Sequence, residues 1–261
     1  MPGSQLLDTL PIAVAFLLFA VLMLAFYEAG FRLGRWWQER EPGEQEGPTA
    51  MLVGSILALL AFLLAVTMGM AADRYDARRA IVLQEADAIG TTYLRAGYLP
   101  EPGSSRSREL LREYVPLRIV LTAQADPTEV VARSEDIQGE LWTIAEDVAK
   151  TTTQGDLVSI YIESLNDVID LHQDRITARS ARVPETVVLL LLGGSALSLA
   201  MVGYNSGLTR RRSMLSGVVL ILALGAVLAI VIDLDRPREG FIQVSQQPLI
   251  DLEQQLGSPP P

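Results

Sequence analysis

Residues 51–72 read MLVGSILALLAFLLAVTMGMAA, and the polar sequence DRYDARRAIV follows directly at 73–82. The first part carries no charge, and about 20 apolar residues at roughly 1.5 Å each are enough to cross the hydrocarbon of a bilayer. No proline follows until Pro100, so none ends the helix where the polar part begins. The stretch therefore predicts one long helix, from Met51 to about Leu99, that crosses a membrane and continues into water.

The composition is that of a chain in which apolar spans alternate with a charged soluble part. Hydrophobic residues make up 49% and charged residues 20% of the 261 positions. The net charge of −10 argues against nucleic acid as a partner. The absence of cysteine excludes disulfides and thiolate nucleophiles, and the single histidine, His172, excludes multi-histidine metal sites. We expect neither a metal nor a cofactor.

Four apolar stretches are long enough to cross a membrane, at about 10–27, 51–72, 184–204 and 214–232. We expect the first to be retained as a membrane helix, because no Lys or Arg precedes it and it is longer than the core of a typical signal peptide. A short charged loop with Trp36 and Trp37 should join the first two. The chain then divides into a first membrane helix pair (1–72), a polar domain (73–183), a second membrane helix pair (184–232) and a tail (233–261).

The polar domain is predicted to be helical, because it shows no sustained alternation of β-branched residues. Beyond the long helix we expect three more, at about 106–124, 128–152 and 156–182, the last running directly into the third membrane span. The tail ends in GSPPP at 257–261, a composition typical of disorder. The predicted fold class is all-α, with four membrane spans and long helices that extend into a soluble helical domain.

The 51–72 span has two distinct faces on a helical wheel. Small residues form one face, which should pack against another helix because small side chains let backbones approach closely; they are Gly54, Ala58, Ala61, Ala65 and Gly69. Bulky residues form the other face, namely Ile56, Leu60, Leu63, Thr67 and Met70. The bulky face could contact lipid, which is the simpler interpretation, or it could line the apolar neck of a pore. The hydroxyl of Thr67 favours a pore, as do the charged residues that follow on the same face, Arg74, Arg78 and Glu85.

A second charged pattern lies on the helix expected at 156–182. Acidic side chains recur on its polar face, at Glu163, Asp167, Asp170 and Asp174. This acidic stripe fits a vestibule wall or a weak Ca²⁺ surface, but an ordinary solvated helix face explains it more simply. His172 lies on the apolar side, where a buried structural histidine is expected rather than a pH sensor.

Catalytic motifs are missing from the sequence. It lacks the phosphate-binding loop, the nucleophile elbow and the zinc-protease motif. The carboxylates between residues 73 and 87 are flanked by arginines, and ion pairing at a membrane edge explains them more simply than acid–base catalysis. We therefore do not expect an enzyme.

Several short motifs resemble the DUF4239 bestrophin-like family of membrane proteins. They are RYDARR at 74–79, EADAIGTTYLR at 85–95, LNDVID at 165–170 and DLDRPREGFI at 233–242. The more distant similarity is to bestrophins, which are pentameric ion channels whose second membrane helix lines an apolar neck and continues into the cytosol. The resemblance implies a homo-oligomer in the cell inner (plasma) membrane, with the polar domain and the tail in the cytoplasm.

This chain departs from bestrophins in three ways. No phenylalanine lies on the Ile56–Met70 face, the tryptophans that follow the neck in bestrophins are absent, and no run of acidic residues resembling a calcium clasp follows Ile232. Pentameric state, conduction and calcium gating are thus implied by the resemblance alone.

The residues and the resemblance together lead to one hypothesis and one alternative. The hypothesis is a homo-oligomeric channel that conducts small inorganic ions passively across the lipid bilayer. The bulky face of 51–72 would form its neck, and Arg74, Arg78 and Glu85 its cytoplasmic mouth. The alternative is a non-conducting, membrane-anchored scaffold or sensor whose helical domain binds a protein partner.

Overall fold

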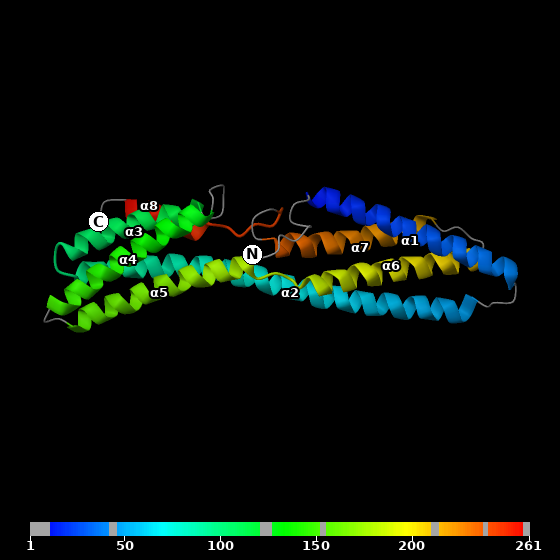
Figure 1. Ribbon diagram of the computed structural model, residues 1–261, viewed down its shortest axis with the longest axis horizontal. Coiled ribbons are helices and arrows are strands. Elements are labelled where there is room, and N and C mark those ends of the chain that lie inside the picture. The colour runs from blue at the N-terminus through cyan, green and yellow to red at the C-terminus, as the bar shows by residue number, and fades with distance from the viewer. Residues whose placement is uncertain are drawn as a thin grey trace. The chain divides into compact units, whose positions relative to one another are not determined.

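The computed structural model describes residues 11–41, 46–120, 127–151, 155–209, 214–236 and 240–257, and each element in these ranges is a helix. Figure 1 labels α1 (Ile12–Arg40), α2 (Glu46–Arg95), α3 (Gly103–Val120), α4 (Pro127–Thr151), α5 (Gly155–Ser180), α6 (Glu185–Leu208), α7 (Met214–Asp235) and α8 (Gln247–Gly257); the 3₁₀ turn η1 (Ala96–Tyr98) follows α2. Four helical segments are long and apolar enough to cross a membrane, and their apolar sequence lies in α1, α2, α6 and α7. The all-α fold class with four membrane spans is confirmed.

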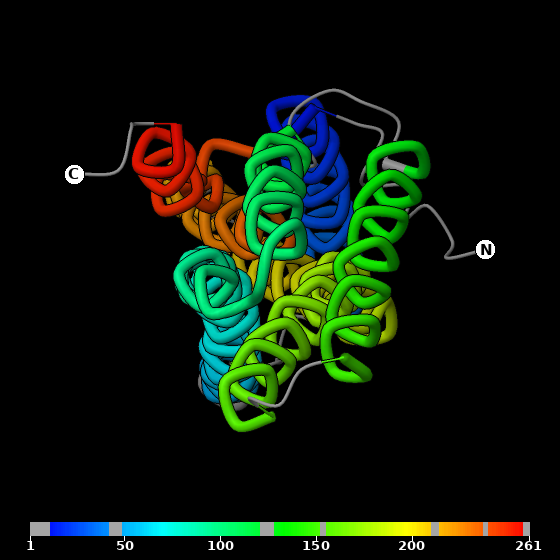
Figure 2. Tube along the Cα trace, turned by 90° about the vertical axis from the view of Figure 1, so that its left-hand side faces the viewer, coloured from blue at the N-terminus to red at the C-terminus, as the bar shows by residue number. Residues whose placement is uncertain are grey.

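The chain forms two compact units that share α2. Unit 1 comprises residues 1–75 and 182–243, which include α1, the first part of α2, α6 and α7. Unit 2 comprises residues 76–181 and 244–261, which include the rest of α2, α3, α4, α5 and α8. Figure 2 shows the helices of unit 2 nearly end-on, with α3 between α4 and α8.

Glycines let α1 and α6 of unit 1 pack closely. A Cβ atom at Gly30 would clash with the carbonyl oxygen of Ala200, and one at Gly203 would clash with that of Tyr27. Two further glycines make equally close backbone approaches, Gly34 and Gly207. Since only glycine fits where two backbones come this near, these positions hold the two membrane helices together.

The end of α7 carries two buried carboxylates that hold neighbouring segments. The carboxylate oxygens of Asp233 accept hydrogen bonds from the backbone N–H groups of Phe241, at 2.8 Å, and Ile242, at 2.9 Å. Oδ1 of Asp235 accepts one from the N–H of Val183 at 2.9 Å. These bonds account for the two aspartates at the end of the fourth span, because each carboxylate satisfies backbone N–H donors of a neighbouring segment.

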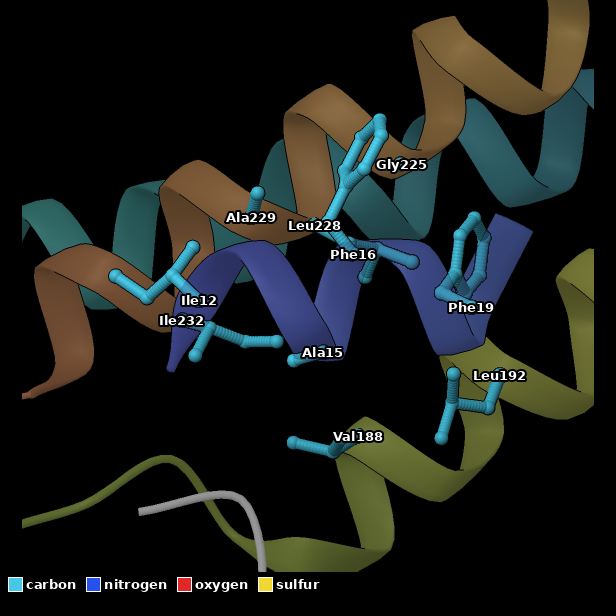
Figure 3. Close-up of a pocket in the computed structure, with 10 residues that line it drawn as sticks. All are labelled: Ile12, Ala15, Phe16, Phe19, Val188, Leu192, Gly225, Leu228, Ala229 and Ile232. Carbon is cyan, nitrogen blue, oxygen red and sulfur yellow. The ribbon is translucent and has the colours of Figure 1, made fainter. Parts of the chain in front are cut away.

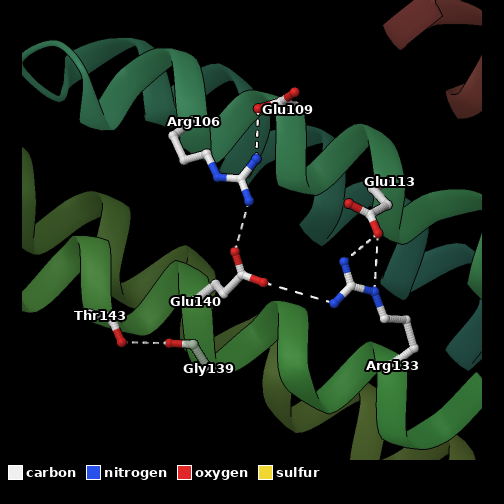
Figure 4. A network of polar contacts seen from close by, with 7 residues as sticks. All are labelled: Arg106, Glu109, Glu113, Arg133, Gly139, Glu140 and Thr143. Atoms are coloured by element: carbon white, nitrogen blue, oxygen red, sulfur yellow. Dashed lines mark hydrogen bonds and ion pairs between the residues drawn. The ribbon is translucent and has the colours of Figure 1, made fainter.

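Unit 2 has an apolar core contributed by all five of its helices. Its buried side chains include Ile89, Tyr114, Leu141, Leu165 and Leu249. Salt bridges on the surface add to the contact between α3 and α4: Arg106 pairs with Glu140, and Arg133 pairs with Glu113 (Figure 4). These side chains are 41–46% exposed, so solvent screens the pairs and burial in the core supplies most of the stability.

Two boundaries differ from the sequence expectations. The region of Trp36 and Trp37, expected to be a loop, is helical, since α1 continues to Arg40 with ion pairs such as Arg32–Glu28 on its surface. The expected continuation of α5 into the third span is wrong, because residues 181–184 are not helical; Pro184 has no N–H to donate and disfavours a helical residue before it.

The tail contains a helix that the sequence analysis did not assign. In α8, Leu249, Leu252 and Leu256 lie on one face and are buried in the core of unit 2. Of residues 257–261, for which disorder is predicted, Gly257 is the last residue of α8, and residues 258–261 lie outside the described residues.

Replacing Gly203 with Val should destabilise unit 1 by about 2–3 kcal/mol, because the added atoms overlap the backbone of α1. Thermal unfolding of the purified protein in detergent measures this. Gly193→Val is the matched control on the same helix, since a Cβ at Gly193 meets nothing within 4 Å. Equal unfolding temperatures for the two variants would contradict the close contact of α1 with α6.

Candidate functional site

One face of α2 is buried along most of the helix. Positions spaced by three and four residues are buried from the apolar span into the polar part: Leu60, Leu64, Thr67, Ala71, Arg78, Val82, Glu85, Ile89 and Thr92. Leu60 and Leu64 pack with apolar side chains of α1, α6 and α7 in unit 1, whereas Val82 and Ile89 pack in the core of unit 2. The spacing is that of a helical packing seam, so α2 turns this face to the interior of each unit.

This buried face includes part of the predicted neck. Leu60 and Thr67 are each 2% exposed. Leu60 belongs to the apolar cluster of unit 1, and the hydroxyl of Thr67 donates to the carbonyl oxygen of Leu63 at 2.8 Å. Both side chains are therefore covered by other parts of their own subunit. Ile56, Leu63 and Met70 are half-buried beside them.

The opposite face of α2 is exposed and carries bulky residues that the sequence analysis did not select. Leu59, Phe62 and Val66 are 60%, 63% and 47% exposed. Their spacing of three and four residues is itself a helix face. Phe62 is the single phenylalanine of the span, and it lies opposite the predicted neck. Its position is the signal in the sequence that could have identified this second bulky face. We call Leu59, Phe62 and Val66 the outward face.

The predicted packing face lies on the same exposed side of α2. Gly54, Ala58, Ala61, Ala65 and Gly69 are all exposed. A Cβ atom at Gly54 or Gly69 would meet nothing within 4 Å. The small residues are therefore not covered by helices of their own subunit, and their packing against a helix of another copy stays a prediction.

The predicted mouth also divides between buried and accessible positions. Arg78 is 8% exposed and Glu85 is fully buried, whereas Arg74 is half-buried. The accessible charges beyond the span are instead mostly acidic: Asp73, Asp76 and Asp87 are exposed. At about 100° per residue, these three lie within about 40° of the direction of Phe62, so they continue the outward face.

Glu85 is the centre of a buried ion cluster in unit 2. Its Oε1 accepts a hydrogen bond from Nε of Arg118 on α3 at 2.5 Å, and its Oε2 accepts one from Nη1 of Arg175 on α5. Nη2 of Arg175 also donates to the carbonyl oxygen of Arg118, at 3.1 Å, and to Oε1 of Gln246, at 2.6 Å. One carboxylate thus joins α2, α3, α5 and the segment before α8, so Glu85 is a core residue and does not line a wet mouth.

A hydroxyl group and an imidazole lie beside this cluster. The hydroxyl of Tyr114 accepts a hydrogen bond from Nε2 of Gln138 at 2.9 Å and lies 3.3 Å from Nδ1 of His172. Burial raises the pKa of Tyr114 to about 12. Burial, with the positive charges of Arg118 and Arg175, lowers the pKa of His172 to about 4. His172 is 2% exposed, as expected for a buried structural histidine.

The acidic stripe of α5 is a solvated surface in the isolated chain. Glu163, Asp167, Asp170 and Asp174 are all exposed. Within the described part of the chain, no group of three or more His, Asp and Glu side chains could hold a metal ion. The stripe is therefore a solvated, negatively charged helix face.

Comparison with known proteins connects these features to a family. The family model described as "Bestrophin-like domain" matches residues 13–249. A crystal structure of a bacterial bestrophin homologue from Klebsiella pneumoniae resembles this chain with a TM-score of 0.68 and 13% identity, covering 94% of this chain and 97% of that chain. A mutant form of that homologue gives a TM-score of 0.70, again with 13% identity and the same coverage. No curated protein matches the chain.

Replacing Glu85 with Gln should destabilise unit 2 by about 3–5 kcal/mol, because Arg118 and Arg175 would lose the carboxylate that they share inside the core. Circular dichroism during heating measures the shift of the unfolding midpoint. Glu163→Gln, which changes an exposed glutamate on α5, is the matched control and should leave the midpoint unchanged. A midpoint for Glu85→Gln equal to that of the control would refute the role of the cluster.

His172 should make the stability of unit 2 depend on pH. Its pKa is about 4 in the folded protein and about 6.5 in the unfolded chain, so below pH 6.5 the unfolded state binds more protons. The contribution that neutral His172 makes to the free energy of unfolding is therefore fully present above about pH 6.5 and is lost as the pH falls towards 4. The unfolding midpoint of His172→Gln should fall less between pH 7 and pH 5 than that of the unchanged protein; parallel curves would show that His172 is not the group responsible.

Proposed function

The chain belongs to the bestrophin-like family, and from this premise we propose that copies of this membrane protein assemble into an ion channel around their α2 helices. The outward face of α2 carries the proposal. Leu59, Phe62 and Val66 lie uncovered in the middle of a membrane span whose opposite face is buried in the subunit. In a closed ring of copies, this face would form an apolar neck that gates ions by excluding water.

The small residues of α2 favour contact with a neighbouring copy in a ring over exposure of this helix face to lipid. On the helix they lie beside the outward face, with Ala61 and Ala65 on the flank away from Leu59. Small side chains allow neighbouring helices to approach closely in a membrane. One flank of each α2 would therefore contact the next copy while its bulky residues face the axis. Five copies, as in bestrophins, is the number that the family suggests.

The acidic residues beyond the span suggest which ions pass. Asp73, Asp76 and Asp87 would repeat in every copy at the cytoplasmic mouth, and a ring of carboxylates concentrates cations and repels anions. Arg79 is also exposed and Arg74 is half-buried nearby, so the three negative charges outnumber the accessible positive ones. We propose a preference for small cations, in a plasma membrane with unit 2 in the cytoplasm.

Phe62→Ala should raise the single-channel conductance at least twofold in planar bilayers, because it widens the apolar neck. Leu18→Ala is the control, since Leu18 is 55% exposed on α1 and has no place in the neck. In a salt gradient, Asp76→Asn should move the reversal potential towards weaker cation selectivity.

Two results would overturn the channel proposal. One is a monomer or dimer in detergent by light scattering, together with no current above that of protein-free bilayers; this would favour the scaffold or sensor alternative. The other is a ring of copies in which Phe62→Ala and Leu18→Ala conduct equally, which would remove the outward face from the conduction path.

A further inference from the structure

The membrane part of unit 1 contains a cavity of about 60 Å³ with apolar walls, between α1, α6 and α7 (Figure 3). Ala15 and Phe16 line it from α1, Val188 and Leu192 from α6, and Ala229 and Ile232 from α7. The cavity is partly open to the outside of the subunit. An apolar group can therefore enter the cavity from outside the subunit.

The cavity arises where the glycine contacts between α1 and α6 are missing. At Gly30 and Gly203 the two backbones touch, but at this end the facing residues are Phe16, Val188 and Leu192, none of them a glycine. A Cβ atom at Gly225 of α7 would lie 2.8 Å from Cε2 of Phe16, so the aromatic ring rests against α7. The space between this ring and α6 is left unfilled and forms the cavity (Figure 3).

The position of the cavity indicates what fills it. Its lining begins at the first residue of α1, lies in the first two turns of α6 and ends near the end of α7, so it lies just inside one end of the membrane spans. Water needs two to four polar partners to remain in such a space, and the lining side chains offer none. Next to it, Leu17 and Leu18 of α1 are 62% and 55% exposed, and in a membrane the acyl chains of lipids cover such side chains.

We propose that the cavity binds a segment of one phospholipid acyl chain, inserted between α1, α6 and α7. The bound chain completes the packing that the glycines provide at the other end of α1 and α6. It wedges the three helices at a fixed separation and is held more tightly than lipid at the exposed surface. This inference requires that unit 1 lies in a bilayer, and it does not depend on whether the protein conducts ions.

Ala229→Leu tests the proposal, because the larger side chain occupies the cavity itself. Ala226→Leu is the matched control, an equal change on the same helix at an exposed position that does not line the cavity. The full-length protein is stripped of lipid in detergent and titrated with dipalmitoyl phosphatidylethanolamine. Native mass spectrometry counts the lipids retained, and thermal unfolding measures the stabilisation that they cause.

We expect the unchanged protein and Ala226→Leu to retain one lipid per subunit and to gain unfolding temperature as lipid is added. Ala229→Leu should bind it at least tenfold more weakly and unfold at the same temperature with or without lipid. If Ala229→Leu fails to fold, Ala15→Leu fills the cavity from α1 and takes its place. Equal lipid retention by the cavity and control variants would overturn the proposal. So would a loss of subunit association in Ala229→Leu alone, since a second copy would then cover the cavity.

Discussion

The continuity of α2 is the constraint on which the rest of the structure depends. It is one helix of 50 residues that carries an apolar span in its first half and packs in the core of unit 2 in its second half. A helix satisfies its backbone hydrogen bonds internally, so it is stable in both surroundings. Leu60 is buried in unit 1 and Glu85 in unit 2, at positions that share one face of an ideal helix.

The two units are held together by different physical means. In unit 1 the backbones of α1 and α6 touch at glycines, because lipid is as apolar as the side chains and close packing must replace the hydrophobic effect. In unit 2 burial of apolar surface drives the packing, and Glu85 adds a charged connection between three helices. A buried ion cluster of this kind favours one arrangement of the helices, because an arrangement that separates the partners leaves a buried charge without compensation.

Two residues of the predicted neck, Leu60 and Thr67, are buried inside the subunit, for a reason that is general to membrane helices. The bulky face of the 51–72 helix, which includes Leu60 and Thr67, is apolar enough to contact lipid or to line a pore. A protein interior selects apolar side chains equally well. The periodicity therefore locates a face without naming its partner. For Glu85, the charged carboxylate indicated a position in contact with water, but the side chain is buried between Arg118 and Arg175. These two partners lie 33 and 90 residues away in the sequence.

The sequence by itself determined the helical class, the four membrane spans, the unbroken helix through residue 82 and the resemblance to bestrophins, because these depend on local composition and period. The buried place of His172 also followed from its helix face. Only the tertiary structure decided which side of α2 turns inward, which charges lie inside unit 2, and that Leu249, Leu252 and Leu256 make the tail part of its core. Those outcomes depend on contacts between residues far apart in the chain, and no local pattern encodes which distant helix will cover a given face.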